Sequence, residues 1–494
     1  HCQNEKQLLK TFLDEYKKIY PDIITGWNVD QFDITYLYNR FSKLFGNSVA
    51  DQLSPWNITT VREWDTFGKK QQAYTLTGVE VVDYLQLYQK FTFKRRDSYK
   101  LENISQIELG KGKINYEEFG AMHLFYKKDY QKFLEYNVRD VVLVEELEDK
   151  LGFLDLTQAM AYDAKCNYID TFGMVKYWET IIYNFLKEQG VQTPPQKKHE
   201  TKTHQIAGAY VKEPIVGGHN WVMSFDLNSL YPHLIMQWNI SPEKMIKGQK
   251  QDVTVDSMLH MKSDLSICKR LNTCVAPNGV MFSRDKQGFF PEIMEVMYDE
   301  RKAWKKKMID YQKVKEKTSD PKEIKKLDTL IKRAYNNQQV RKIALNSAYG
   351  SMANQWFAFF DPNLAEAITY SGQLVIKWSE KIVNEYLNKI LKTDNEDYVI
   401  AIDTDSIYLT MDKFAFEGTC NVWKRRKQKP TGSLGLVLLD RSWTGLDRSW
   451  QVLDRYWQVW DRSWTPGQPL DLSLIHISEP TRRYAISYAV FCLK

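Results

Sequence analysis

The hydrophobic pattern of the first 155 residues alternates between strand-like and helical spacing. Short apolar runs at 23–27 and 78–83 are typical of buried strands. Apolar positions in 34–44 and 127–150 instead recur every three or four residues, which predicts helices with one buried face. Strands separated by helices predict an α/β domain in this part of the chain.

The second half of the chain combines long helices with short strands. A buried strand followed by a turn is predicted at 221–226. Helical spacing covers 292–348, with a Ser-Asp-Pro break that divides it into a pair of helices, and returns over 363–391. The stretches 398–403 and 406–410 flank a two-residue turn and predict a β-hairpin. We therefore expect an α+β arrangement here.

Composition indicates several domains and a local concentration of basic charge. The 494 residues suffice for about three or four domains, and aromatic residues, at 14%, allow nucleic-acid stacking as well as packing. The net charge of the whole chain, +6, is too small to indicate a binding partner. The basic run 301–307 either meets phosphate or forms a solvated helix face.

Cysteine usage and hydropathy favour a reducing, aqueous compartment. The six cysteines are scattered without a Cys-x-x-Cys pair, so neither a zinc site nor a disulfide framework is indicated. No apolar stretch reaches the roughly 18 residues of a membrane span, and no signal peptide is recognisable. We expect a cytoplasmic protein without a membrane partner.

The composition changes abruptly near residue 417. Asp-Arg pairs recur there every seven residues, beginning at 440, without the paired apolar positions of a coiled coil. Such a period also arises when a short tandem DNA repeat is translated, and 472–494 resembles translated sequencing-adapter DNA. We expect 417–494 to be a disordered, non-native tail, and assign it no function.

Two carboxylate sites stand far apart in sequence, each at the end of a predicted strand. Asp226 ends the first strand, and Asp403 and Asp405 lie at the turn of the hairpin. Mg²⁺ prefers carboxylate and carbonyl oxygens, and two-metal phosphoryl transfer needs carboxylates that both ions share. Asp-x-Asp alone also suits a tight turn, but its pairing with Asp226 favours a metal site.

Three motifs resemble those of family B DNA polymerases, in the same order. They are Asp226-Leu-Asn-Ser-Leu-Tyr-Pro, Lys342-Ile-Ala-Leu-Asn-Ser-Ala-Tyr-Gly and Asp403-Thr-Asp-Ser. The resemblance implies template-directed DNA synthesis with two Mg²⁺ ions per active site, or Mn²⁺, bound by Asp226, Leu227 and Asp405, with Asp403 in a lesser catalytic role. The run 239–243 resembles the T-even type of phage enzyme.

The second motif adds a substrate-binding surface. Lys342, Asn346 and Tyr349 share one helix face, and Arg301 and Lys305 are four residues apart on the preceding helix. By resemblance, the three cations bind the incoming triphosphate, and we expect the two helices to face each other.

The residues after Asp226 are implied to contact the sugar. By resemblance, Tyr231 lies under the deoxyribose and excludes a 2′-hydroxyl, and Leu230 is a second substrate-binding residue. Tyr231 lies between Leu230 and Pro232, so a purely structural role in the core is the alternative.

Two further motifs resemble those of the family's 3′–5′ exonuclease. Asn28-Val-Asp-Gln-Phe-Asp33 resembles the second exonuclease motif, and Tyr136-Asn-Val-Arg-Asp140 the third. The resemblance implies that Asp33 and Asp140 hold metal ions while Tyr136 orients the attacking water. We expect all three in one cleft, with Asp30 outside the ligand set.

The resemblance implies an RNase H-like exonuclease domain followed by the palm and helical fingers of a right-hand polymerase, an α/β and α+β multidomain protein. The predicted parts are the exonuclease domain (1–155), a segment of the N-terminal domain with a linker (156–200), the first palm part (201–289), the fingers (290–356), the second palm part (357–416) and the tail (417–494). The first exonuclease motif and the thumb are expected to be missing.

The implied partners are primer-template DNA and deoxynucleoside triphosphates, with a sliding clamp as a further candidate through a C-terminus that the chain lacks. Two alternatives stay open. One is a stand-alone 3′–5′ exonuclease, which the complete polymerase motifs disfavour. The other is an inactive polymerase relic or fragment that only binds DNA.

Overall fold

The computed structural model describes residues 2–66, 69–92, 94–120, 122–195, 206–413 and 482–486. Contacts divide the chain into two compact units. The first unit is His1–Thr193 with Glu300–Ala344, and the second is Pro194–Asp299 with Leu345–Lys494. The long helices α13 (Phe289–Lys315) and α14 (Pro321–Met352) therefore each run from one unit into the other.

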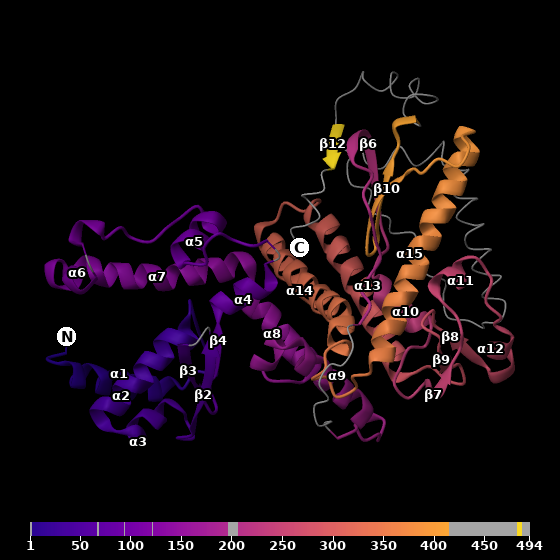
Figure 1. The fold of residues 1–494 in the computed structure, drawn as a ribbon. Helices are drawn as coiled ribbons and strands as arrows, with labels where there is room; N and C mark the ends of the chain where they lie inside the picture. Colours follow the sequence, from indigo (N-terminus) through magenta and orange to yellow (C-terminus); the bar gives the residue numbers. More distant parts are fainter. Residues whose placement is uncertain are drawn as a thin grey trace. The chain divides into compact units, whose positions relative to one another are not determined.

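The N-terminal part of the first unit packs helices around short strands (Figure 1). Its elements are α1 (Glu5–Ile19), β1 (Ile23–Gly26), the π-helix η1 (Val29–Ile34), α2 (Thr35–Phe45), α3 (Asn47–Ala50), η2 (Asp51–Leu53), β2 (Thr59–Thr66), β3 (Lys69–Leu76), β4 (Glu80–Asp83) and α4 (Tyr84–Phe91). Strands β1 and β4 are parallel, and β2 and β3 form an antiparallel ribbon.

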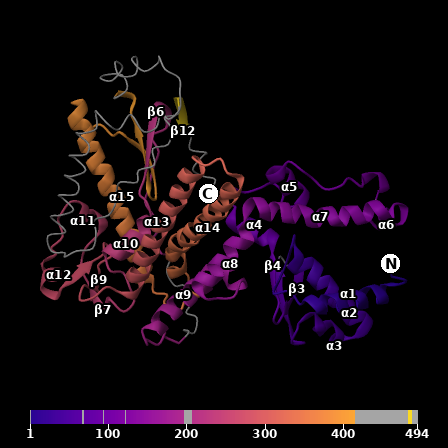
Figure 2. The same ribbon diagram turned by 180° about the vertical axis from the view of Figure 1, so that it is seen from behind.

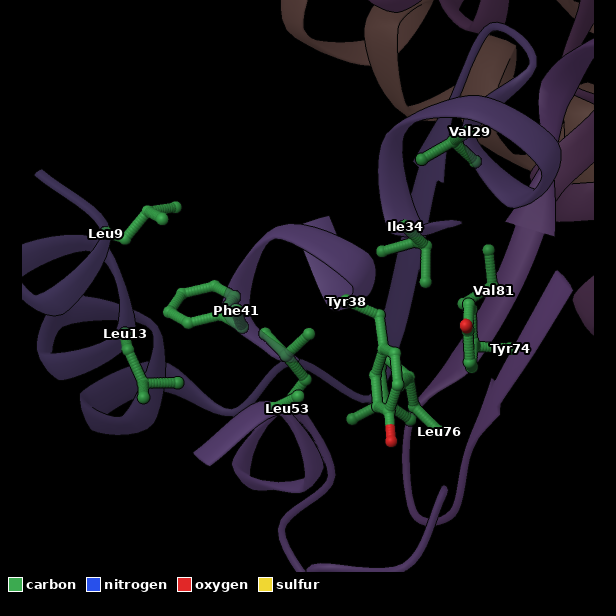
Figure 3. Close-up of a cluster of buried hydrophobic side chains, with 12 residues drawn as sticks. Leu9, Leu13, Val29, Ile34, Tyr38, Phe41, Leu53, Tyr74, Leu76 and Val81 are labelled. Carbon is green, nitrogen blue, oxygen red and sulfur yellow. The ribbon is translucent and has the colours of Figure 1, made fainter. Parts of the chain in front are cut away.

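A hydrophobic core joins α1 and α2 to these strands. Figure 3 shows Leu9, Leu13, Phe41 and Leu53 around it, with the rings of Tyr38 and Tyr74 lying against each other at 4.0 Å between centroids. Apolar residues four apart on α1 share a helix face, so burying that face fixes the helix. The core holds β1, and thus the η1 turn that follows it.

The rest of the first unit is helical. It contains α5 (Leu101–Leu109), η3 (Glu117–Phe119), α6 (Met122–Lys128), α7 (Tyr130–Leu151), α8 (Phe153–Ala164), η4 (Ile169–Phe172) and α9 (Met174–Glu188). A second core, which includes Tyr84, Tyr88, Leu143 and Leu147, packs α7 against α4 and α5. The segment 156–200, predicted as mixed, is thus largely two helices where it is described.

The second unit is built on a five-stranded sheet with the order β12-β6-β11-β10-β5. Its elements are β5 (Val211–Lys212), β6 (Gly217–Asp226), α10 (Leu230–Gln237), β7 (Met245–Lys250), α11 (Val255–Leu259), α12 (Ser266–Leu271), β8 (Thr273–Val275), β9 (Val280–Ser283), α15 (Pro362–Leu391), β10 (Val399–Asp403), β11 (Ser406–Thr410) and β12 (Arg482–Ile486). Strands β7, β9 and β8 form a separate sheet.

Helix α15 covers one face of the large sheet, as both ribbon views show (Figures 1 and 2). Ile376 packs there against Val399, Ile402, Ile407 and Leu409. The helix begins at Pro362. Proline is well tolerated at this position, because an N–H group in the first helical turn has no partner within the helix. The Asp361 side chain caps the helix by accepting a hydrogen bond from the Asn363 N–H.

Most elements agree with the sequence expectations, and the tail differs in one place. The helix pair, its break, α15 and the β10–β11 hairpin are confirmed, with bounds that differ by no more than four residues. Within 417–494, expected to be disordered, β12 is an antiparallel strand on the edge of β6. An edge strand offers unpaired backbone groups to any extended segment. The remainder of that tail prediction lies outside the described residues.

Candidate functional site

The first candidate site is a row of polar side chains across three neighbouring strands of the large sheet. Ser406 on β11 is paired with Asp226 on β6 and with Asp403 on β10. Directly paired residues point to the same face of a sheet. The Ser406 hydroxyl donates a 2.9 Å hydrogen bond to Asp226 Oδ1. Both carboxylates therefore flank one serine at the same end of the sheet.

The turn after β10 brings Asp405 to the same place. Thr404 adopts a left-handed conformation with φ +60°, and its N–H donates to the carbonyl of Tyr210 at 3.1 Å. The N–H of Leu227 donates to the carbonyl of Asp405 at 2.8 Å. The backbone next to Asp226 is thus bonded to Asp405, although 178 residues of sequence separate Leu227 from Asp405. The separation of their carboxylates stays a prediction.

The donor set of this row fits a hard cation. Among the described residues, no three His, Cys, Asp or Glu side chains form a metal-binding group by themselves. Mg²⁺, however, usually takes one or two protein carboxylates and completes its shell with water and substrate phosphate. Asp226 and Asp405 supply such carboxylates, and Leu227, whose side chain is aliphatic, can contribute only its backbone carbonyl.

Tyr231 lies beside this row at the start of α10. Its ring is 4.9 Å from that of Tyr349 between centroids. It also lies over Gly372 of α15, where an added Cβ would come within 3.1 Å of Tyr231 Cε1. Burial, together with the nearby Tyr349 and Asp405, raises the pKa of Tyr231 to about 12. The phenol is therefore neutral, and its ring has Tyr349 and Gly372 as neighbours. The side chain of the preceding residue, Leu230, is buried.

The predicted triphosphate-binding cations lie on α13 and α14 in the first unit. Lys305 and Lys342 are half-exposed, and neither has a hydrogen-bond or ion-pair partner among the described residues. Arg301 precedes Lys305 by one helical turn. The ammonium groups of Lys305 and Lys342 are therefore suited to an anionic ligand. Asn346, one turn beyond Lys342 on α14, is exposed.

The second candidate site is a pocket of the first unit. Asp33, Tyr136 and Asp140 are all among the residues that line it. Asp33 lies on the π-helix η1, a rare element that often occurs at functional sites. Burial raises the pKa of Asp33. The distance between the Asp33 and Asp140 carboxylates stays a prediction.

Lys113 is a residue of this pocket that sequence analysis missed. Its Nζ lies 2.7 Å from Asp140 Oδ2 and 3.2 Å from the hydroxyl of Tyr136. Asp140 Oδ1 is buried and has no hydrogen-bond partner among the described residues. A buried carboxylate oxygen normally has a donor, a water or an ion beside it. The orphaned oxygen therefore fits a cation bound in the pocket.

Asp30 and Asp83 hold the η1 turn rather than face the pocket as ligands. Asp30 is buried and forms an ion pair with Arg62 at 2.7 Å. Asp83 accepts hydrogen bonds from the N–H groups of Asn28 at 3.0 Å and Leu85 at 2.9 Å. The ion pair gives Asp30 a structural role, and its place outside the ligand set stays a prediction.

We expect Lys113→Met to lower the free energy of unfolding by about 1–2 kcal/mol, because Asp140 then keeps a half-buried charge without its donor. The matched control is Lys111→Met, which removes the more exposed pair with Glu146 and should cost less than about 0.5 kcal/mol. Urea unfolding of both variants measures the difference. Equal small losses would mean that Lys113 does not stabilise the pocket.

Comparison with known proteins identifies two matching family models. Residues 175–432, just over half of the chain, match the model for DNA polymerase family B. Residues 1–104 match the model for the exonuclease domain of DNA polymerase family B. The first match extends past residue 417, where the tail was predicted to begin.

Curated relatives match along most of the chain. It is 36% identical over 450 residues to the DNA-directed DNA polymerase of Escherichia phage RB69, and 32% identical over 451 residues to that of Enterobacteria phage T4. Each match covers 83% of this chain and 49% of the relative. A DNA polymerase of Pyrococcus glycovorans is 24% identical over 425 residues, covering 83% and 47%. The chain thus spans about half the length of these relatives.

Of the helices in the described part of the chain, none combines the length and the apolar character needed to cross a bilayer.

Proposed function

This chain belongs to DNA polymerase family B, and on that premise we propose that it performs template-directed transfer of nucleotides from deoxynucleoside triphosphates to a primer 3′-hydroxyl, with an accompanying 3′–5′ exonuclease. The observation that carries the proposal is the shared register of Asp226, Ser406 and Asp403, joined by the bond from Leu227 to Asp405. A binding-only relic would have no need of carboxylates held in this way.

The architecture of the family is assigned here by analogy with its members. The sheet containing β6, β11 and β10 corresponds to the palm, the helices α13 and α14 to the fingers, and the pocket of the first unit to an RNase H-like exonuclease domain. This division is supported by the position of the motifs on those elements.

Divalent metal ions are general cofactors of family B polymerases, and we assign two Mg²⁺ ions to each site, with Mn²⁺ as a substitute. Asp226, Leu227 and Asp405 would hold them in the palm. When bound, such ions favour loss of the proton from the attacking hydroxyl and offset charge on the leaving pyrophosphate. Asp403, which points to the same face, adds negative potential beside these ligands.

The cations of α13 and α14 bind the triphosphate in this proposal. Arg301, Lys305 and Lys342 would donate charge-assisted hydrogen bonds to its oxygens, which are the strongest class of donor contact. Asn346 and Tyr349 extend the same α14 face toward the base. Their side chains would orient the nucleotide rather than carry its charge.

The aromatic ring of Tyr231 would discriminate between deoxyribose and ribose in the incoming nucleotide. Held between Tyr349 and Gly372, it cannot retreat from a ligand above it without a clash. A ring fixed in this manner excludes an added 2′-hydroxyl by contact. The buried Leu230 can take part only through its backbone.

The exonuclease pocket has its own assignment. Asp33 and Asp140 would hold metal ions, and the orphaned Asp140 Oδ1 supports that role. Tyr136 would orient the attacking water through its hydroxyl, which Lys113 fixes by a hydrogen bond. Lys113 would also limit the negative charge of the pocket when no ion is bound.

Primer-template DNA and deoxynucleoside triphosphates are the proposed partners, and a sliding clamp is a further candidate. The two phage relatives favour action in the cytoplasm of an infected host cell. The first test is primer extension by the purified chain with all four triphosphates and Mg²⁺. We expect synthesis that stops on chelation and resumes on addition of Mg²⁺; extension indifferent to chelation would contradict the proposal.

We expect Lys342→Ala to raise the KM for the incoming triphosphate about 10- to 100-fold, the effect of losing one charge-assisted contact. The Kd for primer-template should change less than about twofold, because Lys342 is assigned to the nucleotide alone. The control is Lys326→Ala, which removes an exposed lysine of the same helix some four turns away. Equal losses of nucleotide and DNA binding by Lys342→Ala would show that this residue is structural or binds the duplex.

A further inference from the structure

A buried arginine lies directly beside the predicted triphosphate-binding cations. Arg341 of α14 is 9% exposed. Its Nη2 lies 2.6 Å from Asp163 Oδ1, its Nε lies 2.9 Å from Glu300 Oε2, and its Nη1 donates to Asn337 Oδ1 at 3.3 Å. All three guanidinium nitrogens are therefore engaged by side chains of the first unit, so this arginine is not available to a ligand.

The location of this ion pair matters more than its strength. Arg341 immediately precedes Lys342, and Glu300 immediately precedes Arg301, so the contact joins α14 to α13 where the cations are carried. A slip of one residue along a helix moves a side chain by about 1.5 Å and turns it by about 100°. A planar guanidinium that binds two carboxylates in a fixed geometry opposes such a slip.

The same stretch of α14 also contacts helices α8 and α9, to which the proposed function assigns no role. Asp163 lies in the last turn of α8. On α9, the Trp178 side chain is fully buried, and its Nε1 donates to the carbonyl of Ala344 at 3.2 Å. Asp163 and Trp178 thus hold α14 at positions 341 and 344, within one helical turn.

We infer that Arg341 is a positioning residue for nucleotide binding: through Glu300 and Asp163 it fixes the register of α13 and α14, and thereby the relative placement of Arg301 and Lys342. This inference rests on the proposed function. A buried ion pair generally adds little net stability compared with apolar packing, whereas it does specify one arrangement. Helices α8 and α9 accordingly support the alignment of the two nucleotide-binding helices.

The test uses the whole chain with three substitutions. Arg341→Gln removes the ion pairs, Arg341→Lys keeps the charge without the planar fork, and Glu300→Gln is a milder change because the Glu300 side chain is 47% exposed. The control is Lys332→Gln, which breaks the exposed pair with Asp155 between the same helices α14 and α8. Hydrogen exchange of the amides of 338–346 is measured on each variant beside the kinetics of incorporation.

We expect Arg341→Gln to raise the KM for the triphosphate about tenfold or more and to speed exchange at 338–346, with the Kd for primer-template unchanged. Arg341→Lys and Glu300→Gln should give intermediate values, and Lys332→Gln should match the wild type. A general loss of folded protein would instead lower kcat at constant KM, and that result would overturn the inference.

The exchange measurement separates this inference from the proposed function. If the wild type incorporates nucleotides but Arg341→Gln leaves both KM and exchange unchanged, the positioning role is wrong and the function stands. If the wild type incorporates none, the function fails, and with it the nucleotide role of Arg341. Unchanged exchange in Arg341→Gln would then also refute its effect on the register of the helices.

Discussion

Replacing Asp405 by alanine is expected to lower the rate of DNA synthesis by about 10⁴-fold, the scale on which loss of an essential catalytic group acts. Asp226→Ala should have the same effect. The N–H of Leu227, next to Asp226, donates to the carbonyl of Asp405, and we predict that the two carboxylates share the proposed metal ions. Neither carboxylate alone can hold both ions. The measurement is single-turnover primer extension with Mg²⁺.

Two controls accompany this prediction. Asp403→Ala should cost less, because Asp403 lies in the row but outside the proposed ligand set. Asp394→Ala removes an exposed carboxylate just before β10 and should leave the rate unchanged. Circular dichroism melting shows whether each variant is folded. Near-normal synthesis by a folded Asp405→Ala variant would end the two-metal assignment.

Replacing Tyr231 by alanine is expected to lower the discrimination between deoxyribonucleotides and ribonucleotides by about 100-fold, the range over which a shaped pocket separates close analogues. The ring packs against Tyr349 at 4.9 Å and lies over Gly372, and we propose that it excludes a 2′-hydroxyl by contact. Removal of the ring opens that space.

The matched variant is Tyr231→Phe, which keeps the ring and loses only the hydroxyl. It should retain the discrimination of the wild type, because contact with the ring rather than a hydrogen bond is proposed to exclude the ribose. The ratio of kcat/KM for the two kinds of triphosphate is measured for each protein. If the phenylalanine variant loses as much discrimination as the alanine variant, the tyrosine hydroxyl is responsible.

The regular elements near the palm motifs could be predicted because their patterns are strong. The strand 406–410 coincides with β11, and 363–391 differs from α15 by one residue. The β2–β3 ribbon was not predicted. Its positions 62, 63, 65, 70, 71 and 72 are polar or charged, and most of its described side chains are exposed, so it shows little of the apolar alternation that marks a half-buried strand.

The candidate sites likewise contain residues that the sequence predicted and residues that it did not. The spacing of Tyr136 and Asp140 predicted that they share one helix face, and the resemblance implied Asp33 beside them; all three line the same pocket. Lys113 lies 27 residues before Asp140 in a connecting segment without periodicity, so only the folded path of the chain brings it near. Arg341 lies just before the motif that begins at Lys342, and no sequence signal indicates that it is buried and paired with Asp163 and Glu300.

Single-nucleotide incorporation on four templates, which differ only in the base opposite the added nucleotide, tests the central claim most directly. With the purified 494-residue chain and Mg²⁺, we predict that the complement of each template base is added preferentially, and that Asp405→Ala abolishes all four reactions. Addition of the same nucleotide whatever the template base, or template-directed addition that persists in Asp405→Ala, would contradict the account.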